Sequence, residues 1–198
     1  MRRPERSRVE IFAPLETSRL LLVPIRADHA DGMYEGLREP SLYAYQTDGP
    51  PRDVVALRAR YARLASGHSA DELAHWLNWI LVLRDGGCAA GYVQATVEKN
   101  RASAEIGYLV LPAHQRRGLG GEAVGAMVRH LFAAGVGRLR AVVDVRNAGS
   151  IALVERLGFT RTRTCRSEDV IGGVRGFDHE YVMRPPRAGG AGVPKPRA

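Results

Sequence analysis

Two arginines and three glycines in the middle of the chain have the types and spacing to hold a phosphate group. They stand in residues 111–121, where an apolar run ends at Pro112 and is followed by Arg116 and Arg117. The glycines occupy the place where a helix would begin: Gly118, Gly120 and Gly121. Free amides at a helix start bind phosphate oxygens, and glycine lets the backbone approach the ligand closely. The segment therefore predicts a pyrophosphate-binding turn.

Two other phosphate-binding motifs do not fit this segment. A Walker loop requires Gly-Lys-Ser/Thr at the helix start, whereas Leu119 is followed there by Gly120 and Gly121. A Rossmann fingerprint requires a third glycine where Ala123 stands, and a parallel βαβ unit around it. Because antiparallel strands are expected before the segment, the sequence argues against both nucleotide-binding classes.

The hydrophobic pattern predicts the elements that must position this turn. Strands are expected at 19–25, 76–83, 91–97, 105–111, 139–145, 161–170 and 176–183. Helices are expected at 28–37, 53–67, 118–134 and 148–157, and Asp28 and Asp53 are candidate N-caps of the first two. This order predicts one α+β domain with helices on both faces of a mixed, mostly antiparallel sheet of about seven strands.

The net charge of +8 suggests a polyanion partner, but its location weakens that idea. Residues 1–8 and 185–198 each carry a net charge of +3, which leaves +2 for the rest of the chain. We expect a flexible basic segment over 1–13, a folded domain over 14–184 and a disordered Pro/Gly/Ala-rich tail over 185–198. Nucleic acid is an unlikely partner and a membrane is not expected; without an apolar leader, the cytoplasm is the expected location.

The cysteines and histidines do not predict a metal site. Cys88 and Cys165 stand far apart, which indicates two reduced structural thiols rather than a zinc site or a disulfide framework. The histidines show no ligand spacing. We therefore expect no metal cofactor.

Four segments together resemble the GNAT acetyltransferase superfamily. Residues 115–120, Gln-Arg-Arg-Gly-Leu-Gly, match its Gln/Arg-x-x-Gly-x-Gly/Ala signature, and residues 147–159 are similar to its Asn-x-x-Ser-x-x-Leu-x-Glu-Lys-Leu-Gly-Phe segment. Residues 105–111 and 16–23 resemble the RimJ/RimL branch, which includes enzymes that acetylate the N-termini of ribosomal proteins. The resemblance spans residues 14–184.

The resemblance implies that acetyl-CoA lies between two splayed strands, Tyr108–Leu111 and Leu139–Val145. Backbone groups of Leu109 and Leu111 would pair with the pantetheine arm, and the turn that follows would hold the pyrophosphate. Asn147 would contact the pantetheine arm, cap a helix, or do both. The implied cofactor-binding residues are Leu109, Val110, Leu111, Gln115, Arg116, Arg117, Gly118, Leu119, Gly120, Gly121 and Asn147.

The implied reaction is direct transfer of the acetyl group to a primary amine through a tetrahedral intermediate. Glu105 is the candidate base, acting through water, and the Leu109 amide is the candidate donor to the thioester carbonyl. Many relatives have a tyrosine acid where Val154 stands. Ser150 is then the candidate acid for the leaving thiolate, although a role as a helix-cap residue or as a cofactor contact explains it equally well.

The acceptor and partners are the least defined part of the prediction. The acceptor is a protein N-terminus or a small-molecule amine. Tyr43, Tyr45 and Gln46 border its expected site, and we favour a packing role for them. Trp76 and Trp79 serve either the core or the surface of a possible homodimer. The alternatives are an acyl-CoA-binding protein without turnover, supported by Val154, and a basic nucleic-acid-binding domain, supported by charge alone.

Overall fold

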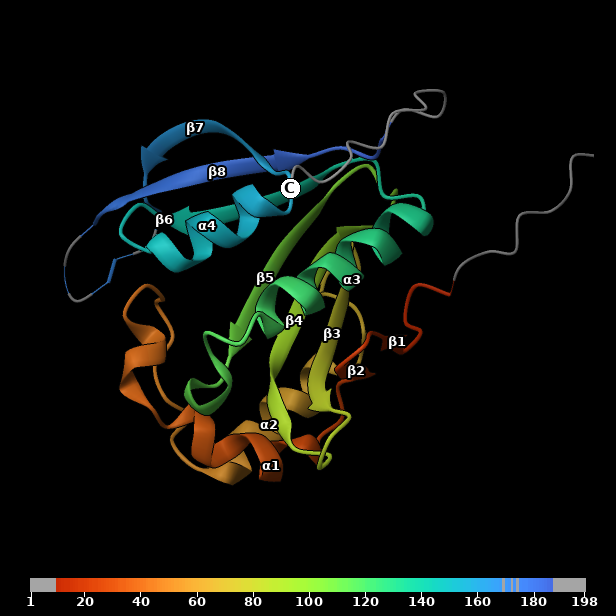
Figure 1. Ribbon diagram of the computed structural model, residues 1–198, viewed down its shortest axis with the longest axis vertical. Coiled ribbons are helices and arrows are strands. Elements are labelled where there is room, and N and C mark those ends of the chain that lie inside the picture. The colour runs from red at the N-terminus through yellow and green to blue at the C-terminus, as the bar shows by residue number, and fades with distance from the viewer. Residues whose placement is uncertain (1–9, 169, 172, 174, 187–198) are drawn as a thin grey trace, which may run out of the picture.

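The computed structural model describes residues 10–168, 170–171, 173 and 175–186 (Figure 1). Most of the expected tail and residues 1–9 of the expected N-terminal segment lie outside this range. The domain begins earlier than residue 14, because Ile11 is buried in the core and the carbonyl of Ala13 accepts a hydrogen bond from Trp79. Trp79 is fully buried, so it serves the core.

The described residues form a single α+β domain with one eight-stranded sheet. The strands are β1 (Leu15–Glu16), β2 (Leu20–Pro24), β3 (Ala74–Leu83), β4 (Ala89–Glu98), β5 (Ala104–Val110), β6 (Leu139–Asp144), β7 (Thr160–Arg166) and β8 (Phe177–Met183). Their order across the sheet is β1-β2-β3-β4-β5-β6-β8-β7. The sequence predicted seven of them and missed the two-residue β1.

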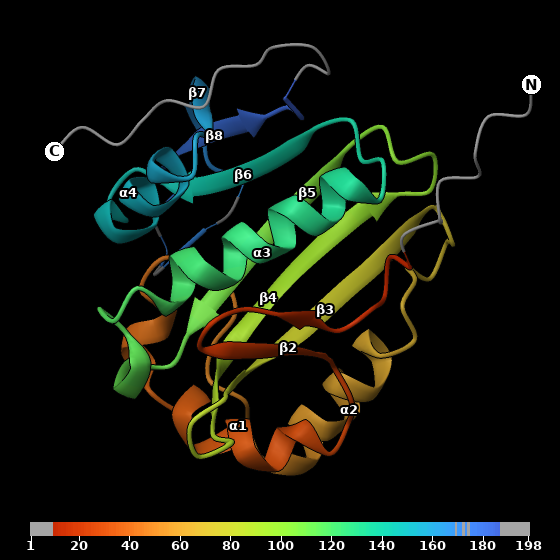
Figure 2. The same ribbon diagram turned by 45° about the vertical axis from the view of Figure 1, so that its right-hand side comes forward.

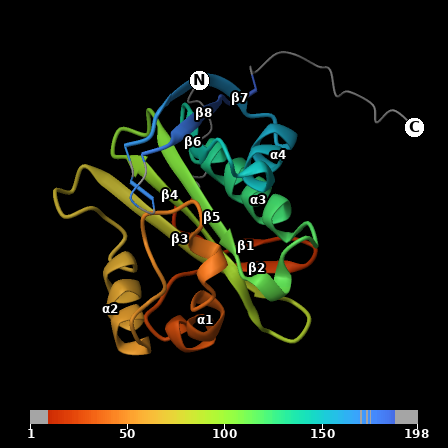
Figure 3. The ribbon, with the colours of Figure 1, turned by 90° about the vertical axis from the view of Figure 1, so that its left-hand side faces the viewer.

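Helices cover both faces of the sheet, as predicted (Figure 3). They are α1 (His29–Leu37), α2 (Val54–Leu64), α3 (Leu119–Ala133) and α4 (Ala148–Arg156), with short 3-10 turns η1 (Pro40–Tyr43) and η2 (Pro112–His114). The larger core lies between the sheet and α3, whose side chains at Leu119, Ala123, Met127 and Leu131 form a fully buried stripe, and α4 packs against the same core (Figure 2). A second core lies under α1 and α2.

The two candidate N-caps behave differently. The Asp53 carboxylate accepts a hydrogen bond from the Ala56 amide at 2.7 Å and caps α2. Asp28 makes no cap bond, because its own backbone is already helical and its carboxylate pairs with Arg26 at 2.8 Å. Asp28 thus occupies the predicted N-cap position and the helix begins where expected, but its side chain does not bond to the amides of the first turn.

The sheet is incomplete between its fifth and sixth strands. β5 and β6 run parallel and pair at Ala104 with Leu139 and at Glu105 with Arg140, after which they diverge (Figure 1). On the other side of β5, pairing with β4 continues as far as Val110. The divergence leaves a V-shaped opening in the sheet, as the resemblance implied.

Candidate active site

The opening between β5 and β6 holds a cavity of about 260 Å³. One wall is formed by Glu105, Gly107 and Tyr108 of β5, and the opposite wall by residues 141–144 of β6. Asn147 and Ser150 of α4 line it as well, so the cavity joins the two motifs that the sequence singled out. Segments that precede and follow α3 in the sequence thus meet at one place.

The direction of the β5 backbone corrects one prediction. The Leu111 amide donates to the carbonyl of Ala90 at 2.8 Å, and the Ser103 carbonyl accepts from the Glu98 amide at 3.0 Å. The register between these points is unbroken, so every second residue, including Leu109, directs its backbone groups towards β4. The backbone groups of Leu109 and Leu111 therefore do not point into the opening. Those of Tyr108 and Val110 do.

The predicted pyrophosphate turn has the backbone of an anion site. Arg116 and Gly118 both take left-handed conformations, with φ of 61° and 76°, before α3 starts at Leu119. Amides of the first helical turn have no intrahelical partner, and alternating right- and left-handed residues direct amides towards a common point. The side chains of Arg116 and Arg117 are exposed beside this point. The turn thus joins positive charge to unpaired donors.

Glycine suits positions 120 and 121 of this turn for different reasons. A Cβ on Gly120 would lie 3.1 Å from the Leu153 Cδ1 atom and 3.4 Å from the Val110 Cγ2 atom, so Gly120 lets α3 approach α4 and β5. A Cβ on Gly121 would meet nothing within 4 Å. Protein packing therefore does not require glycine at position 121, and the open space there fits a phosphate held against the backbone.

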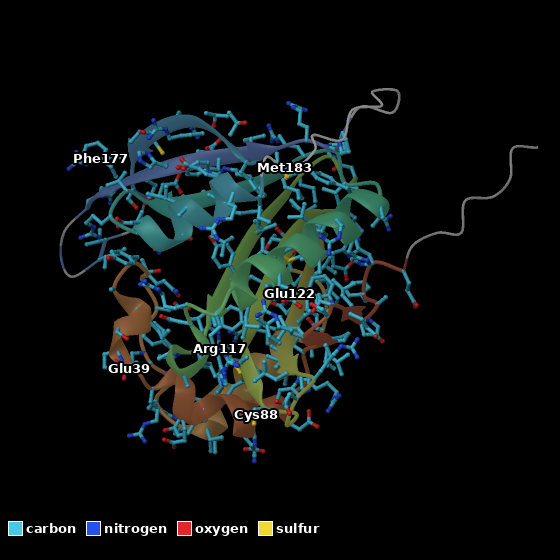
Figure 4. All side chains as sticks on the ribbon, in the orientation of Figure 1. Glu39, Cys88, Arg117, Glu122, Phe177 and Met183 are labelled. Atoms are coloured by element: carbon cyan, nitrogen blue, oxygen red, sulfur yellow. The ribbon has the colours of Figure 1, made fainter. Side chains whose placement is uncertain are left out.

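Side chains that the sequence did not single out hold this turn in place. Arg19 Nη1 donates to the carbonyl of Arg117 at 2.8 Å, and Arg19 Nε donates to Glu122 at 2.7 Å. Glu122 also accepts from the Ser18 hydroxyl and the Arg19 amide. Figure 4 labels Glu122 on α3 and Arg117 in the turn before it. Burial opposes ionisation, but hydrogen bonds from Thr17, Arg19 and Ser18 prevail and lower the pKa of Glu122 to about 2. The one feature of the sequence that pointed to these residues was the resemblance of 16–23 to the RimJ/RimL branch.

Gln115, the first residue of the signature, acts on the strand rather than on the turn. Its Nε2 donates to the carbonyl of Val110 at 2.9 Å. This bond ties the end of β5 to the loop that follows η2. It also occupies one of the backbone groups that face the opening, so the Val110 amide is the group left for a ligand.

Asn147 and Ser150 sit together at the start of α4. The Ser150 amide donates to Asn147 Oδ1 at 3.0 Å, so the helix-cap interpretation of Asn147 is correct. Its side-chain nitrogen remains for a ligand. The Ser150 Oγ lies 2.5 Å from the Tyr108 hydroxyl. Burial raises the pKa of Tyr108 against the opposing hydrogen bond from Ser150. Sequence analysis missed the Tyr108 side chain, although it stands within the quoted motif.

Glu105 lies at the closed end of the V, beside the cavity. Its carboxylate forms an ion pair with Arg140, which also pairs with Glu180 at 3.1 Å. The Glu105 side chain is about half exposed. Val154, by contrast, is fully buried in the core against α3. The residue at the usual tyrosine position is therefore a packing residue.

The segment after α1 contributes to the cavity more than expected. Tyr45 and Gln46 line it, and the Arg146 guanidinium lies 5.7 Å from the centre of the Tyr45 ring. A side chain can both pack and line a cavity, so the favoured packing role stays a prediction for Tyr45. It holds for the Tyr43 hydroxyl, which donates to the Leu37 carbonyl at 2.7 Å.

Two further findings concern metals and membranes. Among the described residues, no three His, Cys, Asp or Glu side chains come close enough to hold a metal ion. No helix in the described part of the chain is long and apolar enough to cross a membrane.

Comparison with known proteins identifies the family. Residues 19–160 match the acetyltransferase (GNAT) domain. A curated relative, the uncharacterized N-acetyltransferase YoaA of Bacillus subtilis, is 26% identical over 159 residues, covering 79% of this chain and 88% of the relative.

Solved structures share the fold at low identity. RimL, the ribosomal L7/L12 alpha-N-protein acetyltransferase in complex with coenzyme A, superposes with a TM-score of 0.77 at 18% identity, covering 87% of this chain and 98% of that chain. A GNAT-family acetyltransferase from Bacillus anthracis gives 0.74 at 16% identity, with the same coverage. Motifs, fold and family match agree, and the chain belongs to the GNAT acetyltransferases, which use acetyl-CoA as the acyl donor.

Proposed function

We propose that this chain moves the acetyl group of acetyl-CoA directly to a primary amine, carried by a protein N-terminus or a small molecule. The observation that carries the proposal is the V between β5 and β6, which leads from a cavity to the pyrophosphate turn. Unpaired backbone groups, a helix N-terminus and two arginines lie along one path. That sequence of groups suits a long, polyanionic thioester.

The residues of this chain fit acetyl-CoA in three places. The backbone of Tyr108 and the amide of Val110 are available to bind the pantetheine arm as a neighbouring strand would. The Asn147 side-chain nitrogen can donate to the same arm. The amides from Arg116 to Gly121 can hold the pyrophosphate, with the space at Gly121 left for it.

For catalysis, the Tyr108 amide replaces that of Leu109 as the donor to the thioester carbonyl, because only the former faces the opening. Glu105 accepts the proton of the attacking amine through water. Its ion pair with Arg140 holds the carboxylate at the base of the V, where the two strands still pair.

A hydroxyl pair takes the place of the missing tyrosine acid. Burial keeps Tyr108 protonated, and its hydroxyl is joined to that of Ser150 at the cavity wall. The pair can give a proton to the departing thiolate and be reprotonated through Ser150. Lack of a tyrosine at Val154 was the argument for a binding protein without turnover, and the Tyr108–Ser150 pair weakens that argument.

The test combines a charge placed at the turn with a matched neutral variant. Gly121→Glu adds a carboxylate where the structure has space, and Gly121→Gln adds the same bulk without charge. Acetyl-CoA should raise the melting temperature of wild type and Gly121→Gln, and much less that of Gly121→Glu. Release of free thiol with a panel of amines, peptides and aminoglycosides then measures turnover. Wild-type affinity in Gly121→Glu would remove the turn from the cofactor site.

A further inference from the structure

A side chain from the neighbouring strand lies where Gly107 of β5 has none. A Cβ atom on Gly107 would lie 2.9 Å from Nε2, 3.1 Å from Cγ and 3.3 Å from Cδ of Gln94, the residue opposite it on β4. The backbone of Gly107 does not itself require glycine, because its φ angle lies outside the left-handed region. Glycine at position 107 therefore leaves the space in which the Gln94 side chain lies across β5.

The carboxamide of Gln94 is available to a ligand in the active-site cavity. Gln94 and Gly107 both line the cavity of about 260 Å³, and Gln94 is exposed there. Its side chain makes no hydrogen bond to any other described residue. The sequence thus keeps an uncharged group with both a donor and an acceptor beside the residue that precedes Tyr108.

Gln94 shares a face of the sheet with the candidate base. It stands opposite Gly107 in the β4–β5 register, and Glu105 is two residues from Gly107 on the same strand, so all three share one face. The Tyr108 side chain points to the other face, where its hydroxyl reaches Ser150. A thioester held in the V by the Tyr108 amide would therefore have Gln94 and Glu105 on the side from which the amine attacks, and the hydroxyl pair on the side of the leaving thiolate.

The attacking amine has two N–H bonds to place on that side. As its nitrogen bonds to the acetyl carbon and the C–S bond breaks, one proton passes through water to Glu105 and the thiolate takes a proton from the hydroxyl pair. Two residues of a strand span roughly 7 Å, which fits a water between Glu105 and an amine beside Gly107. The second N–H stays on the nitrogen of the product amide. A neutral acceptor suits it, because a second carboxylate there would favour the unreactive ammonium form.

We propose that the carboxamide oxygen of Gln94 accepts this second N–H and thereby directs the lone pair of the amine at the thioester carbonyl. Gly107 is glycine because it leaves the space for that contact. Gln94 and the water at Glu105 together use both N–H bonds of a primary amine, so a secondary amine loses one of the two contacts. The inference rests on the proposed acetyltransferase function and assigns to Gln94 a role on the acceptor side, distinct from the binding of acetyl-CoA.

The first test is a double-mutant cycle of Gln94→Ala and Gly107→Ala. Gln94→Ala should lower kcat/KM roughly 10-fold through loss of one hydrogen bond in the transition state. Gly107→Ala should lower it by a similar factor, because the new Cβ displaces the carboxamide. In the double variant the atoms that the Cβ would meet are gone, so the loss should stay near 10-fold instead of reaching about 100-fold. Acetyl-CoA should raise the melting temperature of Gln94→Ala as it does that of wild type.

The second test compares primary with secondary amines. Thiol release is measured with glycinamide, a peptide beginning with glycine and kanamycin, and then with the N-methyl derivative of the one acetylated fastest. The ratio of kcat/KM for the primary amine to that for its N-methyl derivative should fall roughly 10-fold in Gln94→Ala, because the derivative has no second N–H to lose. Gln94→Leu keeps most of the bulk without the hydrogen bond, and it should lower the ratio by a similar factor.

The outcomes separate this inference from the proposed function. A ratio in Gln94→Leu equal to that of wild type, or additive losses in the double variant, would overturn the inference. A Gln94→Leu variant with a lower melting temperature and unchanged kcat/KM would give the side chain only a structural role. Turnover without any effect of Gln94 defeats the inference alone, whereas no thiol release with any amine defeats the proposed function as well.

Discussion

Replacing Glu122 with glutamine should destabilise the protein in a way that depends on pH. The carboxylate is mostly buried and accepts hydrogen bonds from the Arg19 side chain, the Arg19 amide and the Ser18 hydroxyl. Glutamine keeps the size but turns an amide nitrogen towards donors. The substitution therefore removes the charge-assisted bonds and leaves the packing in place.

The magnitude follows from the pKa of Glu122. The difference between its ordinary pKa of 4.5 and the folded value of about 2 corresponds to roughly 3 kcal/mol at pH 7. Because the folded pKa is the lower one, this stability is present in full above pH 4.5 and is lost as the pH falls towards 2. The difference between wild type and Glu122→Gln should shrink to about 2 kcal/mol at pH 3.5.

The assay is urea or thermal unfolding of both proteins at pH 7 and pH 3.5. At pH 7 the melting temperature should fall by about 6–12 °C. Affinity for acetyl-CoA should fall about 5-fold, because Arg19 also holds the Arg117 carbonyl in the turn. Glu35→Gln is the control: its carboxylate is 77% exposed and its one ion-pair partner in the described part of the chain is Arg38, so its loss should change little.

Two outcomes would refute this reasoning. A stability difference that stays constant between pH 7 and pH 3.5 would mean that the Glu122 pKa is not lowered by folding. A destabilised variant with unchanged affinity for acetyl-CoA would mean that Arg19 and Glu122 support the fold without positioning the turn. The first outcome tests the pKa of Glu122 and the second tests its effect on acetyl-CoA binding, so both measurements are needed.

Three further predictions concern the chemistry and the fold. Glu105→Gln should lower kcat at neutral pH by roughly 10²-fold or more, with partial recovery at higher pH as the amine deprotonates itself; an unchanged pH–rate profile would exclude it as the base. Tyr108→Phe should slow turnover more than Ser150→Ala, with melting curves separating lost folding from lost catalysis; the reverse ranking would make serine the acid. Asp53→Ala should cost about 1 kcal/mol in urea unfolding through loss of the α2 cap, while thiol release stays at the wild-type rate.

The sequence located most elements because their hydrophobic periods are long and regular. The stripe on α3 and the hairpin of β3 and β4 are such cases. Asp28 and Asp53 could not be told apart in this way, because each stands directly before a helix and only Asp53 makes a capping bond. Which of them makes a capping bond depends on the ψ angle at the aspartate, −20° at Asp28 and 170° at Asp53, and the residue type does not fix that angle.

The location of the site was predictable from the sequence, but the backbone groups and side chains that form it were not. The opening, the turn and the start of α4 follow from motifs that lie close together in sequence. Whether the backbone groups of Tyr108 or those of Leu109 point into the opening depends on how β5 pairs with β4. The alternation of residues along β5 alone does not reveal that pairing. The bond between Arg19 and Glu122 joins residues 103 positions apart, so no local pattern reveals it.

The divergence of β5 and β6 also has a mechanical consequence. Beyond the pairs at Ala104 and Glu105, the described residues form no ladder bonds between β5 and β6, so β6, β8 and β7 can hinge against the rest of the sheet about the closed end of the V. A pantetheine arm lying between the two parts would hold them in a fixed orientation. Amide hydrogen exchange in β6 should then slow when coenzyme A binds. We expect the departure of the product to involve opening of the same hinge.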